Sequence, residues 1–122
     1  MKWTFEDGRP IYIQIVEQMK VLIASGAYAP GEKIPAVREL AVEAGVNPNT
    51  MQKAMSELER DGFLHSERTS GRFVTEDIEV IDEMKKTLSR EFVRDLFEKL
   101  DRLGMSKEEI IAAVEQWAEE AK

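Results

Sequence analysis

Apolar residues recur at three- and four-residue spacing in the first half of the chain, which is the pattern of amphipathic helices. The first predicted helix spans Pro10–Ser25, and Gly26 ends it. A loop with a Pro30-Gly31 turn follows, and the second predicted helix is the short segment Ala36–Ala44.

A third helix is predicted from Asn47 to about Arg60. Asn47 is a favoured N-cap residue, and Pro48 suits the first helical position. Only Gly45-Val46 separate this helix from the second one, which is the spacing of a helix-turn-helix.

The next segment has the pattern of a β-hairpin. Two short runs, Phe63–Ser66 and Arg72–Thr75, flank the polar turn Glu67–Gly71. Three helices and a hairpin therefore make up a predicted first domain, residues 1–75.

Residues 76–122 are predicted to form a long helix and a short one. Gly104 breaks the first, and Ser106 with Glu109 forms a capping box that opens the second. A second copy of the chain would bury their apolar stripes better than one copy can, although packing on the first domain is the alternative. The predicted dimer interface consists of Ile81, Met84, Leu88, Phe92, Leu96, Leu100, Leu103, Ile110, Val114 and Trp117.

The composition narrows the classes of function. The chain has 122 residues, no Cys and one His, His65, so disulfides and thiolate metal sites are excluded and a catalytic triad is disfavoured. No nucleophile–base pair, carboxylate dyad or phosphate loop stands out, so neither an enzyme nor a cofactor is expected. The start is not a signal peptide and no apolar run is long enough to span a membrane, so we expect a cytoplasmic protein.

The net charge of −7 disfavours simple nucleic-acid binding, but the charge is unevenly placed. Residues 1–75 carry 9 basic and 10 acidic residues, and residues 76–122 carry 8 and 14. No acidic residue lies between Ala44 and Ser56, around the start of the third helix, where the helix dipole normally favours carboxylates. An external anion would explain this gap; chance is the alternative.

The segment GEKIPAVRELAVEAGVNPNTMQKAMSELERDGFLHSERTSGRFV, residues 31–74, closely resembles the DNA-binding domain of GntR-family bacterial transcription regulators. Residues 10–31 resemble that family's first helix and turn. The resemblance implies an α+β, mainly α fold, namely a winged helix-turn-helix that binds double-stranded operator DNA as a homodimer. The short helical C-terminal region and the NPNT motif resemble the YtrA subfamily, which implies a repressor of an operon that often encodes an ABC transporter.

Periodicity and resemblance together give a predicted DNA-binding surface. Asn49, Gln52, Lys53 and Ser56 lie opposite the apolar stripe of the third helix, where Asn and Gln side chains suit adenine. The resemblance adds Arg38 on the second helix and a basic wing that reaches the minor groove. The predicted set is Arg38, Asn47, Asn49, Thr50, Gln52, Lys53 and Ser56 on the helices, and Arg68, Thr69, Gly71 and Arg72 on the wing.

Alternatives remain open at this stage. The polar face could be merely solvated, and Arg38 could pair with Glu39 or Glu43. A winged helix that has lost DNA binding and serves protein interaction is the competing function. The operator, the regulated genes, the sign of regulation and any small-molecule effector are not indicated by the sequence.

Overall fold

The computed structural model describes residues 2–121. They form two compact units, and the boundary along the chain falls between Lys85 and Lys86. The fold is mainly helical with one two-stranded antiparallel hairpin, which confirms the predicted fold class. The division falls later than the end of the hairpin at which the sequence analysis placed the domain boundary. That functional boundary stays a prediction.

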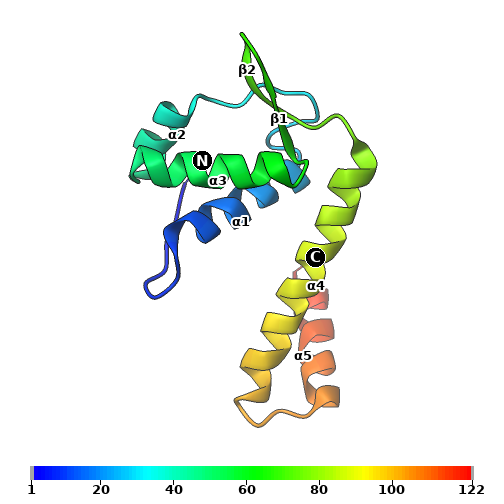
Figure 1. The fold of residues 1–122 in the computed structure, drawn as a ribbon. Helices are drawn as coiled ribbons and strands as arrows, with labels where there is room; N and C mark the ends of the chain where they lie inside the picture. The colour runs from blue at the N-terminus through cyan, green and yellow to red at the C-terminus, as the bar shows by residue number, and fades with distance from the viewer. Residues whose placement is uncertain (1, 122) are drawn as a thin grey trace. The chain divides into compact units, whose positions relative to one another are not determined.

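The first unit is built on three helices, α1 (Ile11–Ala24), α2 (Val37–Ala44) and α3 (Pro48–Arg60). Figure 1 shows α2 at the start of α3 and the hairpin near its end. Their apolar stripes form a closed core, in which the following side chains are 0% exposed: Ile15, Met19, Leu40, Met51, Ala54, Met55 and Leu58. Because α1 and α2 both pack on α3, the opposite face of α3 is left to solvent.

The turn between α2 and α3 depends on Gly45. Its φ of 70° lies in the left-handed region, which favours glycine, and it ends α2. The next amide, of Val46, donates to the carbonyl of Ala41 at 3.0 Å and closes the turn. At the other end, α2 begins one residue later than predicted, because Ala36 is the N-cap and has no side-chain acceptor.

The hairpin consists of β1 (Leu64–Glu67) and β2 (Gly71–Val74), each shifted by one residue from the predicted strands. The shift at Phe63 has a local cause, because its amide donates to the carbonyl of Leu58 and so ends α3 instead of starting a strand. The segment before α2 lies along β2: the amide of Ile34 donates to the carbonyl of Arg72 at 3.0 Å. The hairpin, residues 64–74, is the wing of the winged helix, and residues 32–34 are hydrogen-bonded along the β2 edge of it.

An arm, residues 2–9, is held on α1 by two amide side chains and by the ion pair of Arg9 with Glu17. Gln18 exchanges hydrogen bonds with the amide and the carbonyl of Thr4 at 3.2 and 2.7 Å. Gln14, only 4% exposed, does the same with Glu6 at 2.7 and 3.0 Å. The arm was not predicted from the sequence.

The remaining helices are α4 (Ile78–Asp101) and α5 (Lys107–Glu120). The capping box is confirmed, since Ser106 and Glu109 exchange hydrogen bonds at 3.1 and 2.9 Å. The Ser106 amide, and then the Ser106 hydroxyl, lower the pKa of the Glu109 carboxyl group by hydrogen bonding to it. No helix within residues 2–121 is both long and apolar enough to cross a bilayer.

The predicted dimer residues differ in burial within one chain. Ile81 and Met84 belong to the first compact unit and are buried, as are Leu88 and Ile110 in the second. Leu100 is half-buried. The exposed ones are Phe92, Leu96, Leu103, Val114 and Trp117, and Val93 and Ile111 join them. Within α4 and α5, this exposed set is the apolar surface that a second chain could cover.

Candidate nucleic-acid interface

The exposed face of α3 presents a short polar surface. Asn49, Gln52, Lys53 and Ser56 are all exposed, as the helical periodicity predicts. On the opposite side, Met51 and Leu58 are fully buried and fix the rotation of the helix about its axis. The face thus offers amide, hydroxyl and ammonium groups, which are the groups that pair with base edges and phosphates.

The first turn of α3 is organised by Asn47. Its Oδ1 accepts a hydrogen bond from the amide of Asn49 at 2.7 Å, and Pro48 occupies the first helical position. Asn47 therefore acts as the N-cap, and only its side-chain NH₂ remains for a DNA contact. No acidic residue lies in this turn, so its amide groups favour an anion.

Gln52 and Ser56 are linked to each other along the exposed face. The Gln52 Nε2 donates to the Ser56 Oγ at 3.0 Å, one helical turn away. The bond is exposed, so water or a base edge can replace it at low cost. It extends the Gln52 side chain along the helix in the free protein.

Lys53 has an aromatic partner on another helix. Its Nζ lies 3.8 Å from the centre of the Tyr12 ring, which comes from α1. At this distance the ring face attracts the ammonium group. Lys53 is therefore held over α1, although its side chain remains exposed.

The predicted wing residues fall into two groups. Arg68 and Thr69 lie exposed in the turn between the strands. Arg72 instead donates from Nε to the carboxylate of Glu59 at 2.9 Å, and its side chain is only 19% exposed. This ion pair was not predicted from the sequence, because Glu59 lies thirteen positions before Arg72, at the end of α3.

The carboxylate of Glu59 has a second partner, the hydroxyl of Ser66, which donates to it at 2.7 Å. The hydrogen bonds from Ser66 and then Arg72 lower the pKa of Glu59. Glu59 is therefore a carboxylate at neutral pH, and it joins α3 to both strands of the wing.

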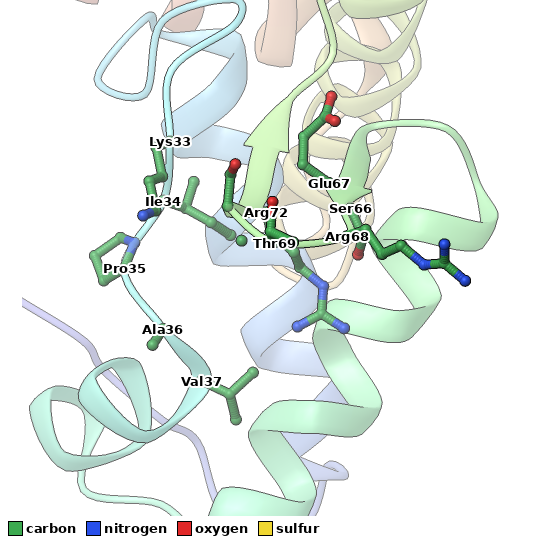
Figure 2. Close-up of a pocket in the computed structure, with 12 residues that line it drawn as sticks. Lys33, Ile34, Pro35, Ala36, Val37, Ser66, Glu67, Arg68, Thr69 and Arg72 are labelled. Carbon is green, nitrogen blue, oxygen red and sulfur yellow. The ribbon is translucent and has the colours of Figure 1, made fainter.

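A hollow of about 550 Å³ lies between the wing and the segment 33–37 that leads into α2 (Figure 2). Lys33 lines this hollow, and the sequence did not predict Lys33 as a site residue. A Cβ added to Gly71 would lie 3.0 Å from the Lys33 Cε, and the φ of Gly71 is 109°. The positive φ is what favours glycine at position 71, since the end of the Lys33 side chain can move; the contact of Gly71 with DNA stays a prediction.

Arg38 is exposed on α2, and within residues 2–121 it forms no ion pair with Glu39, Glu43 or any other carboxylate. The same holds for Arg68 on the wing. The predicted cations thus divide into Arg38 and Arg68, which have no carboxylate partner in the described chain, Lys53, which lies over a ring, and Arg72, which is paired. No cluster of His, Asp and Glu suited to a metal ion occurs in the described part of the chain.

Comparison with known proteins places these features in a family. Residues 11–74 match the model of the family described as "Bacterial regulatory proteins, gntR family". The chain is 39% identical over 102 residues to the HTH-type transcriptional repressor YtrA of Bacillus subtilis, covering 83% of this chain and 78% of that protein.

Two solved structures are similar to the chain. A GntR family transcriptional regulator from Listeria monocytogenes is 37% identical with a TM-score of 0.82, covering 92% of this chain and 98% of the other. The DNA-binding domain of AraR in complex with operator ORX1 is 31% identical with a TM-score of 0.57, covering 62% of this chain and 96% of the other. The first similarity includes the helical C-terminal region; the second is a structure with DNA bound.

Proposed function

Because the chain belongs to the gntR family of bacterial regulatory proteins, we propose that it represses transcription in the bacterial cytoplasm by binding double-stranded operator DNA. The relatives named above are a transcriptional repressor and a transcriptional regulator. The finer parts of this proposal are the DNA-contacting residues, the homodimer, the palindromic operator and the regulated genes.

The observation that carries the proposal is the exposed face of α3. It places Asn49, Gln52 and Lys53 together, on a helix whose first turn carries no acidic residue. A helix of this kind fits the major groove, where Gln and Asn pair with adenine N6 and N7. Positive charge precedes and follows α3 in the sequence, at Arg38 and at Arg68 in the turn of the wing. These two cations would neutralise backbone phosphates.

The proposed dimer rests on the exposed apolar side chains of α4 and α5. Phe92 is 51% exposed and Trp117 is 69% exposed, which is costly for large apolar groups in water. Association of two chains through this set would hold two α3 helices about 34 Å apart, one turn of DNA. The second half-site contact then becomes intramolecular, which raises affinity by roughly 10²–10⁴.

The proposed target is an operon that encodes an ABC transporter. This part rests on the resemblance of the short C-terminal region and the NPNT motif to the YtrA subfamily, to which the 39% identity with a YtrA protein adds support. An effector is not part of the proposal.

The test is a binding titration of the purified chain against DNA from upstream of its own gene, with a shuffled duplex of equal length as the control. We expect tighter binding to the upstream DNA by about 10³ or more, the range typical of specific sites. The same weak affinity for both duplexes would favour the competing function, a winged helix used for protein interaction, for which the net charge of −7 is the supporting observation.

A further inference from the structure

The ion pair between Glu59 and Arg72 lies where it can alter DNA binding. Glu59 is in the last turn of α3, where the helix dipole disfavours a carboxylate. The helix itself gains nothing from Glu59 there. Its stabilisation comes from the wing, through Ser66 of β1 at 2.7 Å and Arg72 of β2 at 2.9 Å.

This pairing neutralises a cation that the wing would otherwise offer to DNA. Counterion release depends on the positive charge that a protein brings to the phosphates. A guanidinium held at 2.9 Å from a carboxylate brings no net charge, and moving Arg72 to a phosphate would leave Glu59 unpaired near DNA. Arg68, which has no carboxylate partner within residues 2–121, is free of this restraint.

We propose that Glu59 is a positioning residue that acts through Arg72, holding it away from DNA phosphates and so weakening binding to DNA of any sequence. The inference rests on the proposed function, since it assumes that the wing meets DNA. Phosphate contacts carry no sequence information, so removing one cation from the wing lowers the affinity for random DNA and for the operator alike and leaves the base contacts of α3 unaltered.

The test is the substitution Glu59→Gln in the full chain. The amide oxygen can still accept from Ser66 and Arg72, so the hairpin is kept while the charge is lost. We expect tighter binding to a random duplex at low salt. The slope of log K against log salt should steepen by about 0.9 per subunit, or about 1.8 for a dimer, as Arg72 gains a phosphate.

Two controls separate this effect from the simple loss of a negative charge. In an Arg72→Gln background, Glu59→Gln should leave the slope unchanged. Glu57→Gln removes a carboxylate from the same helix, one that pairs with Arg60 at 3.1 Å, away from the wing strands, and should steepen the slope much less. An equal effect of Glu59→Gln with and without Arg72, or an equal effect of Glu57→Gln, would overturn the inference.

Two readouts on the DNA-free protein complete the test. The Arg72 Nε–H should exchange with water faster in the Glu59→Gln variant; an unchanged rate contradicts the inference. The ring contact between His65 and Phe73, 5.8 Å between centroids, reports by NMR whether the hairpin is intact. If the unmodified chain binds no duplex, the proposed function fails; if it binds and Glu59→Gln changes nothing, only the role of Glu59 fails.

Discussion

Salt concentration is the most direct perturbation of the proposed interface, because the structure says which cations are available. Arg38 and Arg68 have no carboxylate partner in the described chain, and Lys53 lies exposed over an aromatic ring. Arg72 is paired with Glu59 and is not counted. About three contacts per subunit give about six per dimer, and at about 0.9 each the slope of log K against log salt is about −5.

The size of this effect makes it easy to measure. A slope of about −5 means that raising salt from about 50 to about 200 mM weakens binding by roughly 10³. Fluorescence anisotropy with a labelled duplex, at five or six salt concentrations, gives the slope directly. A slope near zero would refute DNA binding by this surface. A slope of about −7 would mean that Arg72 leaves Glu59 on binding, which contradicts the assignment of Arg72 as a neutralised cation.

Three further predictions concern single elements of the proposed mechanism. Gln52→Ala should cost about 1–3 kcal/mol per half-site on the true operator and almost nothing on random DNA, measured by parallel titrations, because Gln52 carries no charge; equal losses would show that it reads no base. Tyr12→Leu should shift the NMR signals of the Lys53 ε-methylene because the ring face is lost, whereas Tyr12→Phe keeps the ring and should leave them in place; unshifted signals in Tyr12→Leu would show that the ring does not hold Lys53 in solution. Residues 1–85 alone should fold, be monomeric in light scattering and lose roughly 10²–10⁴ in affinity for a palindromic site; if light scattering showed a dimer of residues 1–85, the dimer interface would lie outside α5 and the second half of α4.

The features predicted correctly from the sequence are those encoded within one helical turn. The cap of α3 by Asn47 needs only the next two residues, and the capping box of α5 needs Ser106 and Glu109, three positions apart. The exposed face of α3 follows from the 3.6-residue period once its buried stripe is recognised. Each of these features is a local rule that tertiary packing did not have to override.

The features that were missed depend on how distant segments meet. The Arg72–Glu59 pair forms only after the hairpin has folded back onto the end of α3. The placement of Lys53 over Tyr12 requires the packing of α1 on α3, and the contact of Lys33 with the wing requires residues 32–34 to lie along β2. The sequence therefore identifies the charged side chains, but it does not show which of them form ion pairs in the folded chain.

The arm ahead of α1 shows where sequence change can be tolerated. Gln14 and Gln18 bind the arm through its main-chain amides and carbonyls, groups that every residue except proline supplies. At those contacts the identity of the arm residues is therefore of little consequence, while the two glutamines must be kept. Arg9, at the end of the arm, is an exception, because its guanidinium pairs with the carboxylate of Glu17 on α1. Over evolutionary time positions 4 and 6 can therefore change their side chains, and with them the surface of the arm, without loss of the hydrogen bonds that hold these positions.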